Sequence, residues 1–358
     1  MKRRLLWNIA RGAALTIIAA GTIGWATLAQ AQGNERSAGA AHQQADLSRV
    51  QILRVQDPMS PEQSQVYMLS GDGGNIAVEV FPQGVLLVDS GLAQKSDQVL
   101  AAIRSITKIP TIHYIINTSA DPDNTGGNAA LGMTGNQFVG GNVVGSITDA
   151  GAGAEIVAYQ TVLDRMSGVT GGGPSLPEAM LPTTTYPTSM LKLSSEYHGD
   201  AVELLHEPAA HTDGDTMVWF RISNVLVTGE IFDPTRYPVI DLKRGGSING
   251  EIKALNDILD VAFPYFRMED GTMIVPGHGR ICDSADVAYY RDMVTIIRDR
   301  VQDMISKGST LEQVESADLT ADYDPYYAHN EMHYTGRQFV EDIFKSLTAQ
   351  KHSRSKGN

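Results

Sequence analysis

The sequence predicts an α/β (or α+β) fold in which layered sheets and helices alternate along the chain. Apolar runs of strand length alternate with segments of helical spacing in both halves of the sequence. The chain has 358 residues, which is enough for one large domain or two small ones with a substantial core. Hydrophobic residues make up 42% and charged residues 19%, so wholesale disorder is excluded.

The N-terminal segment has the order of a secretory signal. Residues 2–4 are basic, an apolar stretch covers 13–28, and residues 29–31 (Ala-Gln-Ala) place small side chains where a signal peptidase cuts. Residues 1–31 therefore predict a signal peptide and a periplasmic or secreted protein. The alternative is an uncleaved inner-membrane anchor, although the apolar stretch is short for a spanning helix. Residues 32–48, rich in Gln, Ala, Gly and Ser, predict a flexible leader.

The first half of the folded part predicts a strand meander followed by alternating helices and strands. Short apolar runs bounded by glycine-rich turns indicate strands, and apolar residues spaced three and four apart indicate helices. A segment rich in Gly, Pro and Thr, 168–188, predicts a long loop with little structure of its own. The predicted strands are 66–69, 76–81, 85–88 and 112–116, and the predicted helices are 96–106 and 155–166.

The second half repeats the same alternation and ends in helices. A turn at Ser223-Asn224 separates two of its strands, and a short strand runs into Pro276-Gly277-His278-Gly279. The predicted strands are 202–205, 216–221, 225–228 and 273–275, and the predicted helices are 248–261, 284–305 and 336–347.

Polar residues collect where the predicted strands end. Residues 117–128 follow one strand, 208–216 join two others, and 228–230 and 276–279 each close a strand. Loops that leave strand ends at one edge of a sheet are the usual place for a site. We therefore expect these four segments to form one site.

The polar segments carry a recognisable series of motifs. They read Asn-Thr-Ser-Ala-Asp-Pro-Asp-Asn-Thr-Gly-Gly-Asn at 117–128, Ala-His-Thr-Asp-Gly-Asp at 210–215, Thr-Gly-Glu at 228–230 and Pro-Gly-His-Gly at 276–279. Together with Leu-Leu-Val-Asp-Ser-Gly at 86–91, their order and spacing resemble the motif series of the metallo-β-lactamase-fold hydrolases.

The resemblance implies a fold and a domain organisation. It implies a four-layer αβ/βα sandwich with metal ions held between the two sheets at one edge. We expect residues 49–281 to form this metallo-β-lactamase-like domain and residues 282–350 to form a C-terminal helical extension packed on it.

The resemblance also implies seven metal-ligand positions, and this chain departs from the family at four of them. Three positions keep the family's residue, two hold other carboxylates that can still ligate, and two hold weak ligands. These are Asp123, His211 and His278, then Asp121 and Glu230, then Ser119 and Asn124.

The three carboxylates give a physical reason to expect a cation. If Asp121, Asp123 and Glu230 converge in one pocket, each raises the pKa of the others, and burying them unpaired is costly. A divalent ion relieves this repulsion. We expect one ion held by Asp123, Glu230 and His278, with His211 or Asp121 assisting. The oxygen-rich set suits zinc or a harder ion such as manganese, iron or magnesium.

The predicted activity is hydrolysis of an ester, lactone, lactam or related bond in a small-molecule substrate. A metal-bound water would be the nucleophile, and Asp123 would orient that water or take its proton. The alternative is a pseudoenzyme: a metal-free or weakly metal-binding periplasmic binding protein. The net charge of −13 disfavours nucleic-acid partners, and the lone Cys282 excludes an internal disulfide and a thiolate metal cluster. The sequence does not indicate an oligomeric state.

Overall fold

The computed structural model describes residues 51–54, 65–137, 153–171, 173–193, 201–262, 271–328 and 334–356. The chain divides into two compact units, Met1–Asp46 and Leu47–Asn358, and every described residue belongs to the second. The predicted signal peptide and the predicted leader lie outside the described residues. Within the described ranges, no helix combines the length and the apolar character needed to cross a membrane.

The first sheet has seven strands in the order in which they occur along the chain. Its first four strands pair antiparallel, and from the fourth strand onward the pairing is parallel. The strands are β1 (Gln51–Arg54), β2 (Gln65–Ser70), β3 (Ile76–Phe81), β4 (Gly84–Val88), β5 (Ile112–Asn117), β6 (Glu155–Tyr159) and β7 (Thr184–Tyr186).

The second sheet has five strands in the order β12-β11-β10-β9-β8. All its pairs are antiparallel except β11 and β12, which run parallel. The strands are β8 (Met190–Lys192), β9 (Val202–Glu207), β10 (Asp215–Phe220), β11 (Val225–Gly229) and β12 (Met273–Pro276).

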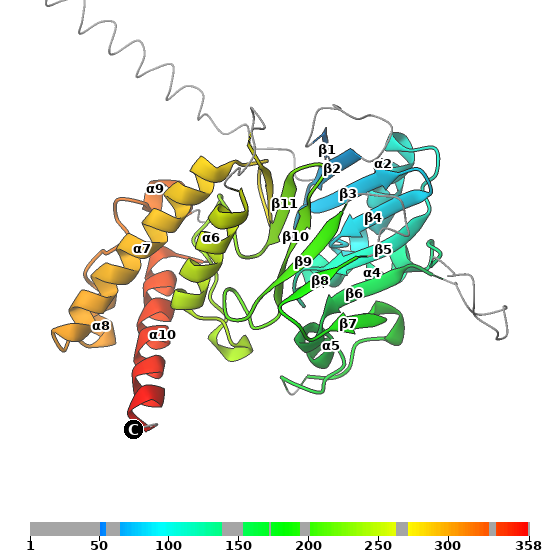
Figure 1. The fold of residues 1–358 in the computed structure, drawn as a ribbon. Helices are drawn as coiled ribbons and strands as arrows, with labels where there is room; N and C mark the ends of the chain where they lie inside the picture. Colours follow the sequence, from blue (N-terminus) through cyan, green and yellow to red (C-terminus); the bar gives the residue numbers. More distant parts are fainter. Residues whose placement is uncertain are drawn as a thin grey trace, which may run out of the picture. The chain divides into compact units, whose positions relative to one another are not determined.

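Helices cover the outer face of each sheet (Figure 1). Those of the first sheet are short, and those of the second include the longest helices described. They are α2 (Ser96–Ile106), α3 (Pro122–Thr125), α4 (Asn128–Gly132), α5 (Gln160–Met166), α6 (Ile248–Ala262), α7 (Ser284–Ser306), α8 (Leu311–Glu315), α9 (Asp324–Tyr327) and α10 (Gly336–Lys356), with 3-10 turns η1 (Ala93–Lys95), η2 (Glu178–Met180) and η4 (Leu242–Arg244).

The two sheets pack face to face, which follows from the alternation of side chains along their strands. On β4, Leu86 and Val88 join an apolar cluster with Val218 and Val227 of the second sheet, whereas Leu87 points outward against α2. Strand β4 is buried at every position, as expected of a strand covered on both faces. The layers run helix, sheet, sheet, helix, and the predicted fold class is confirmed.

The C-terminal helices share a core with the second sheet. Ile258 of α6, Val294 of α7 and Phe339 of α10 belong to one buried cluster with Leu226 of β11 and Ile274 of β12. Figure 1 shows α6, α7 and α10 together on this side of the sheet. Asp283 caps α7 by accepting hydrogen bonds from the backbone of Ala285 and Asp286, which fixes where the helix begins.

One sequence prediction about local structure is wrong. The predicted helix 155–166 is a strand, β6, followed by the short helix α5. Residues 156–158 are buried on both faces between β5 and β7, and a short apolar run of this kind reads equally as strand or helix until its pairing is known. Segment 168–188 contains two short elements, η2 and β7, of which β7 pairs with β6, and the rest of its described residues form a loop, as predicted.

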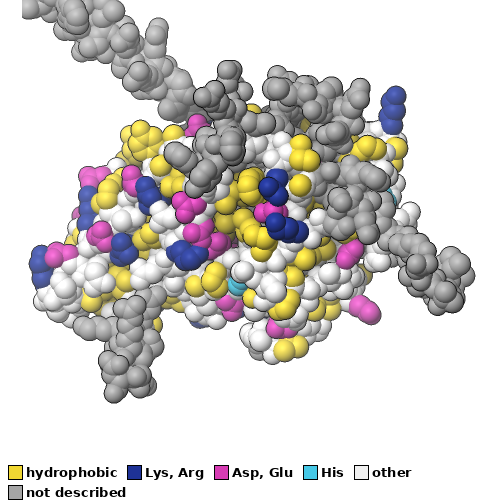
Figure 2. Space-filling model, in the orientation of Figure 1, with side chains coloured by type: hydrophobic (Ala, Val, Ile, Leu, Met, Phe, Trp, Pro, Cys, Tyr) yellow, Lys and Arg dark blue, Asp and Glu magenta, His cyan; other side chains and the backbone are white. Residues whose placement is uncertain are grey.

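Charged side chains on the surface are mixed in sign. Figure 2 shows that, on the face drawn, acidic and basic side chains of the described residues lie next to one another. Many of them form ion pairs along or between the outer helices, such as Arg280 with Asp286 and Arg337 with Glu315. Pairs this exposed contribute little to stability individually.

Candidate metal centre

The loop that follows β5 carries two of the predicted acids, and its backbone is fixed by hydrogen bonds and a close contact. Asn117 and Asn128 exchange side-chain hydrogen bonds of 3.1 and 2.8 Å across the loop. A Cβ at Gly127 would lie 2.3 Å from the carbonyl oxygen of Ser90, so only glycine allows this close approach. The loop therefore places Asp121 and Asp123 on a fixed backbone.

Asp89 anchors the same loop from the end of β4. Its carboxylate accepts hydrogen bonds from the Thr118 amide (2.8 Å), the Thr118 hydroxyl (2.7 Å) and the Asn124 side-chain amide (2.9 Å). Complete burial raises the pKa of Asp89 to about 7, although these hydrogen bonds oppose the shift. Because the Asn124 side chain donates to Asp89 and accepts from the Ser119 hydroxyl, it stabilises the conformation of the loop.

Asp123, Glu230 and His278, which we call the open triad, come together from three different elements. Asp123 lies in α3, Glu230 follows β11 and His278 follows β12. The His278 Nε2 atom is 3.3 Å from Asp123 Oδ2 and 3.3 Å from Glu230 Oε1, and one ligand atom of each residue lies within 4.8 Å of the others.

Two buried atoms of the open triad have no hydrogen-bond partner among the described residues. They are Glu230 Oε1 and His278 Nε2, which face each other. Burial alone would lower the pKa of His278, but the carboxylates of Glu230 and Asp123 raise it well above its ordinary value. Donor atoms that are buried, close together and unsatisfied are what a cation requires of its ligands.

Arg236 supplies part of the charge around the open triad. Its guanidinium contacts Glu230 Oε2 at 2.8 Å and Asp233 Oδ2 at 2.7 Å. Burial raises the pKa of Glu230, yet His278 and Arg236 together hold it below its ordinary value. The carboxylates of Asp123, Glu230 and Asp233 carry three negative charges, and Arg236 carries one positive charge. With His278 in the neutral form that a metal ligand needs, two negative charges remain. One divalent cation cancels that charge, so the residues present fit such an ion.

Asp121, His211, Ser119 and Arg244, which we call the closed cluster, are arranged differently. Asp121 Oδ2 lies 2.9 Å from His211 Nε2 and accepts a 3.0 Å hydrogen bond from the Ser119 hydroxyl. Asp121 Oδ1 contacts Arg244 Nη2 at 2.7 Å. Although burial raises the pKa of Asp121, His211 and Arg244 lower it below its ordinary value.

His211 is held as a cation in the closed cluster. Its Nδ1 lies 2.6 Å from the Val239 carbonyl oxygen, which can only accept, so Nδ1 carries a proton. A hydrogen bond from Nε2 to ionised Asp121 then requires a second proton. Burial opposes this, but Asp121 and Asp215 raise the pKa of His211 to about 10. The carboxylates of Asp121 and Asp241 carry two negative charges, and Arg244 compensates one of them. The second proton on His211 compensates the other.

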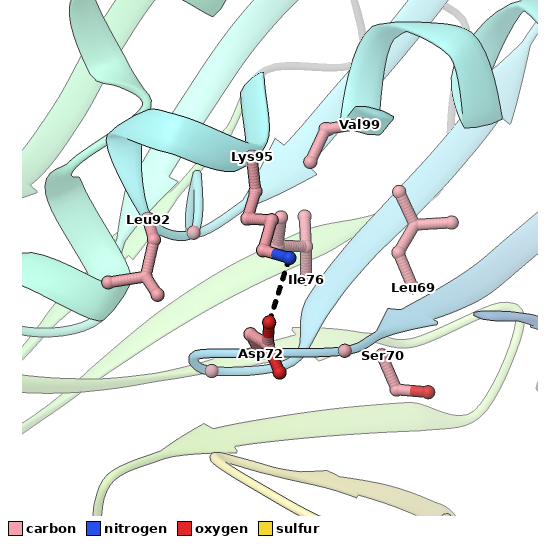
Figure 3. Close-up of a pocket in the computed structure, with 10 residues that line it drawn as sticks. Leu69, Ser70, Asp72, Ile76, Leu92, Lys95 and Val99 are labelled. Atoms are coloured by element: carbon pink, nitrogen blue, oxygen red, sulfur yellow. Dashed lines mark ion pairs between the residues drawn. The ribbon is translucent and has the colours of Figure 1, made fainter. Parts of the chain in front are cut away.

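The hairpin between β2 and β3 supports the open triad from the other side. The Asn75 side chain donates to the carbonyl oxygens of Pro276 (2.9 Å) and Gly279 (3.1 Å), which flank His278. Figure 3 shows a small pocket at this hairpin, where Asp72 pairs with Lys95 at 2.8 Å. This ion pair fastens the hairpin to η1 and so helps to fix the His278 turn.

The structure therefore divides the sequence-predicted site residues into two groups. Asp123, Glu230 and His278 form the open triad, whereas Asp121, His211 and Ser119 contact one another and Arg244. Asn124 contacts the closed cluster only at Ser119, whose hydroxyl lies 3.1 Å from its amide oxygen, while its amide nitrogen donates to Asp89.

The sequence analysis missed the two arginines. It assigned the compensation of the converging acids to a metal ion, but Arg236 and Arg244 supply two of the positive charges. Arg236 lies six residues after Glu230, and this nearness was the only signal available. Nothing in the sequence marks Arg244, because its contact with Asp121 joins residues that are far apart in the chain.

Comparisons with known proteins find likeness in structure only. No family model matches the chain, and no curated protein matches it. Solved structures similar to it include the DIM-1 metallo-beta-lactamase (14% identity, TM-score 0.48, 69% of this chain and 97% of that one). Others are a metallo-beta-lactamase from Pontibacter korlensis (14%, 0.48, 69% and 99%) and VMB-1 (12%, 0.48, 69% and 97%). What the chain does is therefore argued below from its own side chains.

Proposed function

We propose that the chain is a metal-dependent hydrolase in which Asp123, Glu230 and His278 hold one divalent cation. The observation that carries the proposal is a pair of buried atoms in the open triad, Glu230 Oε1 and His278 Nε2, which lie 3.3 Å apart and make no hydrogen bond among the described residues. With His278 neutral, as a metal ligand must be, the surrounding side chains carry two uncompensated negative charges, which supports the proposal. The two carboxylates and one imidazole suit zinc or a harder ion such as manganese, iron or magnesium.

A bound divalent ion would supply a water of lowered pKa and would polarise the oxygen of a carbonyl or related group. The chain's own residues would position and deprotonate that water. Asp123 has the most exposed side chain of the open triad, at 26%, so it is the member that a water and a substrate reach most readily. We assign to its carboxylate the orientation of the attacking water or the acceptance of its proton.

The proposed reaction is hydrolysis of an ester, lactone, lactam or related bond in a small molecule. We also propose that the protein is exported, on the strength of the signal-like order of residues 1–31. The negative net charge and the mixed surface of Figure 2 support a small-molecule substrate over a nucleic acid.

A second candidate is a metal-free periplasmic binding protein, and specific contacts favour it. Arg236 pairs with Glu230, Arg244 pairs with Asp121, and protonated histidines at 211 and 278 would compensate the remaining acids without any ion. In this state the same polar side chains would hold a polar ligand by hydrogen bonds and charge and would hydrolyse nothing.

Metal content and hydrolysis together separate the two candidates. The full chain, freed of metal and dialysed against zinc or manganese, should retain one ion per chain and hydrolyse a member of an ester, lactone and β-lactam panel. The Asp123→Ala/His278→Ala variant should lose both properties. His206→Ala is the matched control, since that half-buried histidine stacks on Tyr159 outside both clusters and should retain metal. A wild-type chain that binds no ion under any loading condition would overturn the hydrolase proposal and leave the binding-protein candidate.

A further inference from the structure

We infer that Arg244 is the permanent cation of the closed cluster and thereby limits the centre to one divalent ion. This inference rests on the proposed function, because it concerns the second place in the same site where an ion would otherwise sit. The two acid-and-histidine groupings share one loop, which carries Asp121 and Asp123 two residues apart, whereas His211 and His278 lie on different loops. The structure leaves only one of them open.

The donor atoms of the closed cluster already satisfy one another. One oxygen of Asp121 receives the His211 ring and the Ser119 hydroxyl, at 2.9 and 3.0 Å, and the other receives the Arg244 guanidinium at 2.7 Å. The guanidinium also lies 3.4 Å from His211 Nε2, the atom that would have to ligate a metal. An entering ion would therefore meet a positive group at both of its prospective ligands.

The open triad shows the opposite condition. Its contacts from His278 to the two carboxylates are 3.3 Å, and buried atoms of Glu230 and His278 lack hydrogen bonds among the residues described. Its nearest arginine, Arg236, contacts the far oxygen of Glu230, Oε2, and leaves Oε1 facing His278. A cation that enters this group takes the place of a proton on His278 between the two carboxylates, and it displaces no arginine.

Arg244 is held in place by its own surroundings. Asp241 accepts hydrogen bonds from the backbone amides of Lys243 and Arg244, which closes the turn η4, and its second oxygen pairs with Arg244 Nε at 2.7 Å. Arg165 donates to the Arg244 carbonyl oxygen at 2.9 Å. Gly245 follows with a φ of 87°, a conformation that favours glycine. These contacts aim the guanidinium at Asp121.

Ion counting tests the inference directly. The full chain is freed of metal, equilibrated with excess Zn²⁺, and its bound zinc is counted by atomic emission. Wild type should bind one ion and Arg244→Ala one more than wild type. The added ion should disappear in Arg244→Ala/His211→Ala. Lys243→Ala is the matched control, because it removes the neighbouring exposed cation of the same turn, and its count should equal that of wild type.

The results that overturn the inference differ from those that overturn the proposed function. A wild-type chain with two ions, one of them lost in His211→Ala, contradicts the role of Arg244 and leaves a hydrolase centre standing. A folded Arg244→Ala that binds no more zinc than wild type contradicts it equally. If wild type binds none, the proposed function fails, and a single ion gained on removing Arg244 still supports the inference. If Arg244→Ala does not fold, equal zinc counts in wild type and His211→Ala support it, and a lower count in His211→Ala contradicts it.

Discussion

Opposite charges only a few ångströms apart decide what each acid at the strand ends can bind. Asp121 and Asp123 are two residues apart and of the same type, yet Asp121 is paired with Arg244 and His211 while Asp123 lies 3.3 Å from His278. The motifs in the sequence predicted that these acids and histidines lie together. They did not predict the pairing, because long, flexible arginines reach the site from turns whose course depends on tertiary packing.

Glu251 presents a separate problem at the residue scale. Its side chain is fully buried in α6, and neither carboxylate oxygen has a hydrogen-bond partner among the described residues. Burial raises the pKa of Glu251 well above its ordinary value, and the negative charge of Asp215 adds to the shift. The folded chain therefore keeps a proton that the unfolded chain releases above about pH 4.3. Through this group, stability falls as the pH rises above that value.

Glu251→Gln should stabilise the protein at pH 8 by about 1–3 kcal/mol, because the amide cannot ionise in its buried position. The gain should shrink as the pH falls toward 4, where the glutamate is protonated in both states. Urea unfolding of both proteins at several pH values measures it. Glu312→Gln, an exposed acid in α8, is the control and should change nothing. A Glu251→Gln protein that is less stable than wild type at pH 8 would contradict this reading of the buried acid.

At the scale of elements, close backbone contacts position the loops that carry the site. Helix α6 packs on the loop that leads to His211, where a Cβ at Gly250 would lie 1.8 Å from the Ala209 carbonyl oxygen. The sequence predicted α6 from its apolar spacing but gave no sign of this contact. The prediction of a helix at β6 failed for the same reason, because a contact between distant segments decides the structure. Pairing with β5 and β7 outweighs the local pattern of apolar residues.

Gly250→Ala should destabilise the protein by about 1–3 kcal/mol, because the methyl group must push α6 away from the loop. Gly132→Ala in α4 provides the comparison, as its Cβ would lie 3.6 Å from Ile156, an ordinary contact. That change should be neutral or slightly stabilising. Urea midpoints of both variants give the answer. Equal effects of the two substitutions would show that the packing of α6 on this loop is looser than described.

At the scale of the whole described unit, the C-terminal helices and the site belong to one core. Phe339 of α10 stacks on Tyr237, with ring centroids 5.1 Å apart, and Tyr237 donates a 2.8 Å hydrogen bond to Asp324. Tyr237 directly follows Arg236, whose guanidinium holds Glu230. The layered fold could be predicted from the spacing of apolar residues, since each strand and helix turns its regularly spaced apolar side chains toward the core. The contacts that link α10 to the site through Tyr237 and Arg236 could not be predicted, because they join residues that are distant in the sequence.

Phe339→Ala should lower the free energy of unfolding by about 3–5 kcal/mol and leave a single transition, because the residue is fully buried in the shared core. Far-UV and near-UV circular dichroism should follow the same urea curve. Tyr326→Ala is the control, since that side chain is 66% exposed and its loss should have little effect. Two separate transitions would show that α10 unfolds independently of the sheets.

The location of a bound ion tests the proposed centre most directly. Crystals of the chain grown with Mn²⁺, and measured for anomalous scattering, should give one strong peak within bonding distance of Asp123, Glu230 and His278. No peak should lie between Asp121 and His211, where Arg244 is expected to remain. A map with no peak at the open triad, or with a peak only in the closed cluster, would contradict the proposed centre.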